Sequence, residues 1–261
     1  MKIKEVIAAL EQFAPLPLQE DWDNAGLQTG LTETEASGAL LCLDVNERIV
    51  DEAIAKGCNV VVSHHPLIFR PLRQIAGRGD VQRTVAKAIR NDVAIISMHT
   101  NMDNARGGVN WQMAERMGLQ HVRTLAGTDT PEERKAEGAL GELPEPMAAA
   151  DFLKMLKKAF CVECLQANEL LRRPIRRVAL CGGAGDFMLG DAVKAGADAF
   201  VTGEMHYHVF FDHEQELQIA VLGHYQSEQY TTEVFRRILG EQCPGLPLHV
   251  AETNTNPIVY V

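Results

Sequence analysis

The hydrophobic positions of this chain fall into short runs between polar and glycine-rich turns, a pattern typical of buried strands. Small and β-branched residues fill 59–63, 93–97 and 217–222. The segment 151–159 differs, because its apolar residues recur at helical spacing and its lysines fall on the other face. We therefore predict a helix there. Strands that alternate with helices predict an α/β fold.

Part of the chain repeats with an ungapped offset of 139 residues. The aligned segments are 39–42 with 178–181, 52–57 with 191–196, and 59–63 with 198–202. Each copy has the order strand, turn, helix, glycine, strand, which predicts a parallel pair with a right-handed crossover. Any two such units look alike, but the unbroken register favours an internal duplication. We predict two related α/β domains, the second inserted in the first.

The domain boundaries follow from two segments. Residues 124–145 are rich in Thr, Glu, Gly and Pro and show no apolar period, which predicts loops joining two lobes, with room for short strands. The last segment begins with the strand at 217–222, and it must return to the first lobe if its polar residues share a site with His64. We therefore predict a discontinuous metal-binding domain, 1–125 plus 217–261, and an inserted related domain, 126–216.

Metal-ligating residue types gather at the ends of three predicted strands, where α/β proteins place their sites. These residues are His64, His65, Asp103, His224 and Glu228. Imidazole and carboxylate together suit Zn, Mn, Fe, Co or Ni. If a helix starts after Gly223, His224 and Glu228 project from one face. Because one carboxylate can bridge two ions, the set suffices for two divalent metals.

Other polar residues lie near these candidates. His99, four residues before Asp103, could act as a general base or acid, could orient Asp103, or could be structural. Glu204 occupies the position in the second copy that His65 occupies in the first, and it could touch substrate. With His206 and His208 it could equally belong to a solvated polar loop. Asp23 and Asn24 could line the pocket or simply form a turn.

Composition narrows the function classes. The chain has 261 residues, 46% of them apolar, and a formal net charge of −10. That charge argues against non-specific nucleic-acid binding, which needs a basic surface, although a local basic patch could still exist. No apolar run approaches the roughly 20 residues of a membrane span, and the N-terminus lacks the apolar core of a signal peptide. Six scattered cysteines in a chain of this length favour a reducing cytoplasm.

The motifs in their order along the chain resemble one known family. They are Asp21–Gln28, Ser63–Phe69, His99–Asp103 with Gly107–Asn110, Thr202–Glu204, and Gly223–Glu228. The chain is similar to the family labelled "GTP cyclohydrolase 1 type 2 homolog", also called the NGG-interacting-factor-three-like family. The resemblance covers nearly the whole chain.

This resemblance implies two related α/β domains, a ring-shaped (toroidal) homohexamer and a dinuclear metal site inside the ring. It assigns His65 and Asp103 to one ion, His64 and His224 to the other, and Glu228 to a bridge between them. Many members of the family continue after this glutamate with Arg-Gly-Gly, whereas this chain has Gln229-Tyr230-Thr231. The departure leaves the ligands intact and puts the neighbouring pocket wall in doubt.

Two classes of function fit these observations. The first is a metal-dependent hydrolase of a nucleotide or related phosphate compound, with His99 and Glu204 as catalytic residues and two divalent ions per chain as cofactors. The family label points to ring opening of GTP. The second is a non-catalytic metal-binding scaffold or metal chaperone whose ring binds other macromolecules. Metal-dependent turnover of a nucleotide would separate the two.

Overall fold

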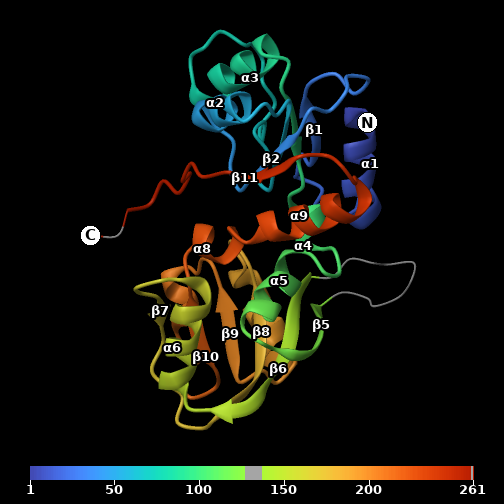
Figure 1. Ribbon diagram of the computed structural model, residues 1–261. Helices are drawn as coiled ribbons and strands as arrows, with labels where there is room; N and C mark the ends of the chain where they lie inside the picture. The colour runs from blue at the N-terminus through green and yellow to red at the C-terminus, as the bar shows by residue number, and fades with distance from the viewer. Residues whose placement is uncertain (127–136, 260) are drawn as a thin grey trace. The chain divides into compact units, whose positions relative to one another are not determined.

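The computed structural model describes residues 1–126, 137–259 and 261, and it shows a mixed α/β fold with two sheets (Figure 1). The chain divides into two compact units. Unit 1 comprises Met1–Met102 and Thr231–Val261, and unit 2 comprises Asp103–Tyr230. The predicted fold class is confirmed.

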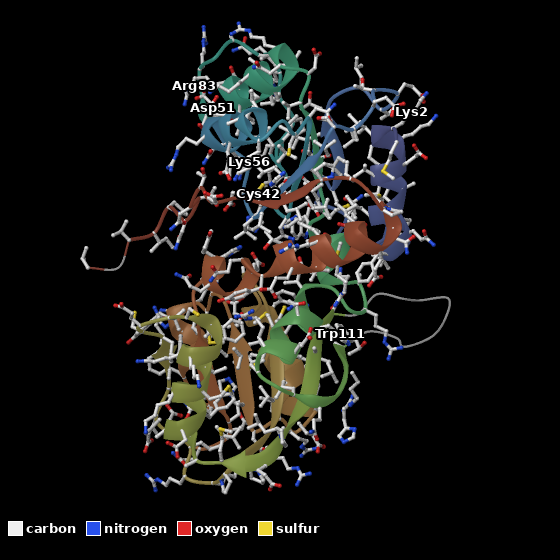
Figure 2. All side chains as sticks on the ribbon, in the orientation of Figure 1. Lys2, Cys42, Asp51, Lys56, Arg83 and Trp111 are labelled. Atoms are coloured by element: carbon white, nitrogen blue, oxygen red, sulfur yellow. The ribbon has the colours of Figure 1, made fainter. Side chains whose placement is uncertain are left out.

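Unit 1 is built on a five-stranded sheet of order β1-β4-β3-β2-β11. Its elements are α1 (Ile3–Phe13), η1 (Leu16–Leu18), β1 (Gly26–Thr29), β2 (Ala39–Cys42), α2 (Glu47–Ala55), β3 (Val60–Ser63), α3 (Asp80–Arg90), β4 (Ala94–Ser97), α9 (Thr231–Gln242) and β11 (Leu248–Val250). Helices α2 and α3 pack on one face of the sheet through a core that includes Ile49, Val61 and Val85. Their solvent side carries ion pairs such as Lys87–Asp51 and Arg83–Glu47 (Figure 2 labels Asp51 and Arg83).

Unit 2 is built on a six-stranded sheet of order β5-β6-β8-β9-β10-β7. Its elements are α5 (Val109–Arg116), β5 (Gln120–Ala126), β6 (Glu137–Met147), α6 (Ala149–Phe160), β7 (Gln166–Ala167), β8 (Ile175–Cys181), η2 (Asp186–Met188), α7 (Leu189–Lys194), β9 (Ala199–Thr202), η3 (Tyr207–Phe210), β10 (Gln218–Val221) and α8 (His224–Glu228). Helices α5 and α6 cover one face, where Phe152, Leu156 and Phe160 are fully buried. Helix α4 (Thr100–Asp103) spans the point where the chain enters this unit.

The repeat at offset 139 recurs in the strand pairing. Strands β2 and β3 are parallel with Ala39 opposite Val60 and Cys42 opposite Ser63, and β8 and β9 are parallel with the pairs at 178/199 and 181/202. Each partner is displaced by the same 139 positions. In both units a third parallel strand follows, and an antiparallel strand that comes earlier in the chain closes its edge. The shared topology is what an internal duplication predicts.

The expected boundaries at 125 and 217 differ from those of the two units. Residues 103–125 and 217–230, assigned above to the metal-binding domain, lie in unit 2. The reason is strand pairing, because β5 pairs with β6 and β10 pairs with β9 along its whole length. Whether the units are independent domains stays a prediction.

In the described part of 124–145 the structure has strands, which the sequence allowed there, in place of loops. Strand β5 extends to Ala126 and β6 begins at Glu137, and the two pair antiparallel. A Cβ at Gly141 would lie 2.9 Å from the Leu119 Cβ, so glycine here permits close approach rather than marking a loop. Residues 127–136 lie outside the described structure. In the part that is described, no helix is long and apolar enough to cross a bilayer.

Asp198 connects the start of β8 to the start of β9. Its carboxylate accepts backbone N–H bonds from Arg176 (3.0 Å) and Arg177 (2.8 Å) and pairs with Arg173. In the first copy Asn59 accepts the equivalent bond from Ser37 N at 2.8 Å. Burial raises the pKa of Asp198, but these hydrogen bonds outweigh it and lower the pKa below its ordinary 3.8.

We expect Asp198→Ala to lower the free energy of unfolding by about 1–2 kcal/mol near neutral pH, since hydrogen bonds to a charged group are lost from a partly exposed site. A lowered folded-state pKa stabilises the protein above the ordinary carboxyl pKa, and this contribution disappears as the pH falls through the folded value. The difference between variant and parent should therefore shrink in acid. Urea unfolding across pH measures it, with exposed Asp151→Ala as the control; a difference independent of pH would contradict the ionic origin.

Candidate metal centre

Unit 1 places three imidazoles together at the ends of β3 and β4. The ring centroids of His64 and His65 are 4.9 Å apart, and that of His99 lies 5.3 and 5.4 Å from them. One nitrogen from each ring lies within 4.8 Å of the others, so this group could hold a metal ion. His99 thus joins the two predicted ligands. Their common origin at parallel strand ends is the feature that the sequence predicted.

Each of these three rings is held through its Nδ1 atom. His64 Nδ1 donates to the Met98 carbonyl at 2.9 Å. His65 Nδ1 donates to Asp44 Oδ1 at 2.7 Å, and His99 Nδ1 donates to Asp23 Oδ1 at 2.7 Å. A ring fixed in this way presents Nε2 as its ligand atom, the arrangement that metal-binding histidines commonly have.

The two carboxylates that hold these rings are themselves fixed as anions. Burial raises the pKa of Asp23, but hydrogen bonds from His99 and Thr100 outweigh it and lower the pKa to about 2. Burial also raises the pKa of Asp44, and hydrogen bonds from His65 and Thr255 lower it further than burial raises it. Both groups are therefore ionised near neutral pH and favour a protonated Nδ1 on their histidine.

Sequence reasoning missed Asp44 and left Asp23 undecided between a pocket residue and a turn. Asp44 follows β2 by two residues, so its place at a strand end was a usable signal. Asp23 lies in an irregular segment, and only the fold brings it to His99, 76 positions away. The Asn24 side chain also binds across the chain, donating to the Ile68 carbonyl at 2.6 Å.

Unit 2 carries the remaining predicted ligands. His224 and Glu228 lie one turn apart on α8, as the spacing predicted, with His224 Nε2 at 3.1 Å from Glu228 Oε2. His224 Nδ1 donates to Glu204 Oε1 at 3.0 Å. Glu204 therefore orients His224, one of the predicted ligands, through a contact that sequence reasoning did not identify. The catalytic role predicted for Glu204 stays a prediction.

The negative charges of Asp103 and Glu228 act on one buried thiol. Burial raises the pKa of Cys181 most, and the negative charges of Asp103 and Glu228 raise it further. Cys181 therefore stays a thiol, and we do not count it as a ligand. Asn110 links Asp103 to the turn after β8. Its side chain donates to the Asp103 carbonyl at 3.1 Å and accepts from Gly182 N at 3.0 Å.

The glycines after β8 make room for Glu228. Gly183 has φ of +60°, and a Cβ there would overlap Glu228 Oε1. Its amide donates to Ser227 Oγ at 3.0 Å. This turn therefore lets the backbone approach α8, which explains the glycine at position 183.

His206 and His208 do not extend this cluster. His206 Nδ1 bonds to Asp186, and its side chain is 88% exposed. The Asp186 carboxylate raises the pKa of His206. His208 instead stacks with Phe211. These contacts fit the solvated polar loop that the sequence offered as one alternative, and a substrate contact stays a prediction.

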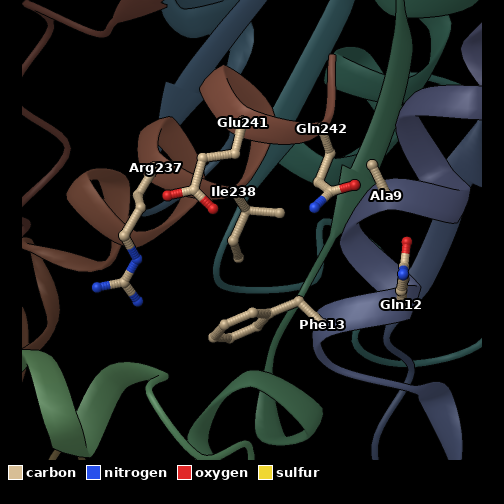
Figure 3. Close-up of a pocket in the computed structure, with 7 residues that line it drawn as sticks. All are labelled: Ala9, Gln12, Phe13, Arg237, Ile238, Glu241 and Gln242. Atoms are coloured by element: carbon tan, nitrogen blue, oxygen red, sulfur yellow. The ribbon is translucent and has the colours of Figure 1, made fainter.

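A pocket of about 230 Å³ lies elsewhere in unit 1, between α1 and α9 (Figure 3). It is lined by Ala9, Gln12, Phe13, Arg237, Ile238, Glu241 and Gln242. None of the predicted ligands lines it, so this pocket is not the predicted metal site.

Residues 1–257 match the family described as Duf34/NIF3 (NGG1p interacting factor 3). Among curated proteins, a "GTP cyclohydrolase 1 type 2 homolog" of Clostridium perfringens is 33% identical over 87% of each chain. A protein of the same name from Clostridium acetobutylicum is 28% identical and covers 100% of this chain and 99% of its own. Among solved structures, a Staphylococcus aureus hypothetical protein superposes with a TM-score of 0.91 at 26% identity, covering 100% of this chain and 99% of that one. A Bacillus cereus protein related to NIF3 gives 0.89 at 25%, with the same coverage.

Proposed function

Since this chain belongs to the Duf34/NIF3 family, we propose that it is a dinuclear metal-dependent hydrolase of a nucleotide or related phosphate compound. Histidine and acidic groups of the chain could hold a metal ion. In the proposal His64, His65, Asp103 and His224 bind two divalent ions, and Glu228 bridges them. The ions are Zn, Fe, Mn, Co or Ni, which accept mixed imidazole and carboxylate ligands.

The observation that carries this proposal is the shared anchoring of four histidine rings. His64, His65, His99 and His224 each donate Nδ1–H to a carboxylate or a backbone carbonyl of their own unit. Metal-binding histidines commonly have such a partner, which fixes the tautomer and the ring orientation. The donor chemistry therefore fits divalent metals in both units.

The chemistry of the residues follows from this geometry. When bound, divalent ions supply charge stabilisation and make a water molecule a better nucleophile at neutral pH. Asp23 fixes His99 with Nδ1 protonated, so His99 Nε2 can accept or return a proton. Asp44 positions His65, and Glu204 positions His224 while keeping the catalytic role proposed for it. Because the relatives are named "GTP cyclohydrolase 1 type 2 homolog", GTP is the first substrate to test.

The alternative is a non-catalytic metal-binding scaffold or chaperone. The two are separated by stripping the purified chain with a chelator, restoring each candidate ion and measuring turnover of GTP, other nucleotides and phosphodiesters. The hydrolase proposal expects turnover that needs the ion. A fully metallated protein with no turnover would favour the scaffold. The ring-shaped homohexamer belongs to the same proposal, and light scattering tests it.

We expect Asp44→Asn to weaken metal affinity by about 10–100-fold, the usual effect of losing a partner that orients a ligand histidine. Asn keeps the shape but removes the negative charge that favours Nδ1–H on His65. Competition with a fluorescent chelator measures the change. Asp51→Asn on α2 is the matched control, since Asp51 is exposed and pairs only with Lys87 among the described contacts. Unchanged affinity in Asp44→Asn would remove His65 from the ligand set.

A further inference from the structure

Two exposed aromatic side chains flank His99 within unit 1. Trp22 is 60% exposed and Phe69 is 46% exposed. Their ring centroids are 5.9 Å apart, and they lie 6.0 and 6.2 Å from the His99 ring. Large aromatic residues are mostly buried, and a cluster of exposed ones commonly marks a binding surface.

The segments that carry these rings are tied together. Asn24, two residues after Trp22, donates to the Ile68 carbonyl at 2.6 Å, and Ile68 N donates to Gln28 Oε1 at 3.1 Å. Asp23, between Trp22 and Asn24, holds His99. The backbone on either side of the two rings is therefore fixed, so the aromatic surface is formed before any ligand arrives, which lowers the entropic cost of binding.

Positively charged side chains come directly after Phe69 in the sequence. Phe69 begins a loop that carries Arg70, Arg73 and Arg78, all of them exposed. None of the three side chains makes an ion pair or hydrogen bond within the described part of the chain. In a protein of net charge −10, three such guanidinium groups within nine positions favour an anionic ligand.

We propose that Trp22 and Phe69 bind the planar ring of a phosphate-bearing ligand beside His99, and that Arg70 contributes to binding its phosphate. The ligand class is a nucleotide rather than a sugar phosphate. This inference rests on the proposed function for its choice of site, and it adds the residues that select the substrate. Bases stack on aromatic side chains through a π-face that every base has.

The chain offers a direct probe, because it has only two tryptophans. Trp111 packs against the core of unit 2, where Figure 2 labels it. In Trp111→Phe the emission comes from Trp22 alone. Titration of the full-length variant with guanosine 5′-monophosphate should quench this emission saturably, guanosine should quench it at higher concentration, and ribose 5-phosphate should not.

Substitutions then distinguish the contribution of the aromatic ring to binding from that of the positive charge. Calorimetry measures the affinity of each variant. Trp22→Leu should weaken binding of guanosine 5′-monophosphate by about 5- to 100-fold, the usual effect of removing one stacking ring. Trp22→Phe keeps a ring and should retain most of the affinity. Arg70→Gln should weaken binding of the nucleotide but leave the affinity for guanosine unchanged. Phe187→Leu removes a ring of similar exposure (67%) from unit 2 and is the matched control.

Three outcomes overturn the inference: equal quenching by ribose 5-phosphate, unchanged nucleotide affinity in Trp22→Leu, or a change of oligomeric state in Trp22→Leu without a change of affinity, which would make the surface a subunit contact. The readout is binding, so it is independent of turnover. Hydrolysis of a non-aromatic phosphate ester without ring binding would leave the proposed function standing and refute this inference. Nucleotide binding without hydrolysis would leave this inference standing and refute the proposed hydrolase function.

Discussion

Replacing His99 with alanine should leave the metal content unchanged and lower turnover by about 10²–10⁴-fold, the usual contribution of a general acid or base. The expectation rests on the contact between His99 Nδ1 and Asp23, which fixes the tautomer and leaves Nε2 to move a proton. Asp23→Asn removes the charge behind that tautomer, so it should lower turnover in the same direction.

Elemental analysis beside the kinetic assay decides between two roles for His99. Its ring lies with those of His64 and His65 in a group that could hold an ion, so a ligand role is the competing possibility. Loss of metal in His99→Ala would make His99 a ligand or a structural residue. His206→Ala is the control, because His206 also bonds to an aspartate through Nδ1 but is exposed.

Replacing Glu228 with alanine should reduce the bound metal from about two ions per chain to nearly none, because the proposal gives Glu228 the bridge between them. His224→Ala should chiefly weaken one ion. Glu228 is buried on α8, with its Oε2 3.1 Å from His224 Nε2, so its removal also takes this contact away from the His224 ring. Elemental analysis of purified variants measures the metal content.

The matched control for this change is the exposed Glu214→Ala, which should keep both ions. Circular dichroism and thermal unfolding must show that Glu228→Ala remains folded. Glu228→Gln tests charge at constant shape, since the amide oxygen is a weaker ligand than a carboxylate. Full metal content in folded Glu228→Ala would refute the bridge, and the loss of a single ion would make Glu228 a ligand of one metal only.

Local patterns were enough to predict much of the scaffold. The runs 59–63, 93–97 and 217–222 became β3, β4 and β10, because short length, polar or glycine-rich flanks and β-branched residues together favour a buried strand over a helix. The repeat at offset 139 carried the register of two parallel strand pairs. The spacing of His224 and Glu228 gave a shared helix face, since residues four apart always meet on a helix.

Only the tertiary structure decided which partners these elements meet. Strand β10 looks alike whether it returns to the first sheet or extends the second, and its pairing with β9 placed it in unit 2. The carboxylates that hold the histidines lie 76, 21 and 20 positions away from them, for Asp23, Asp44 and Glu204. The sequence determined which side chains stand at strand ends, because that depends on local periodicity. The fold determined which carboxylate meets which imidazole, because neighbouring strand ends come from distant parts of the chain.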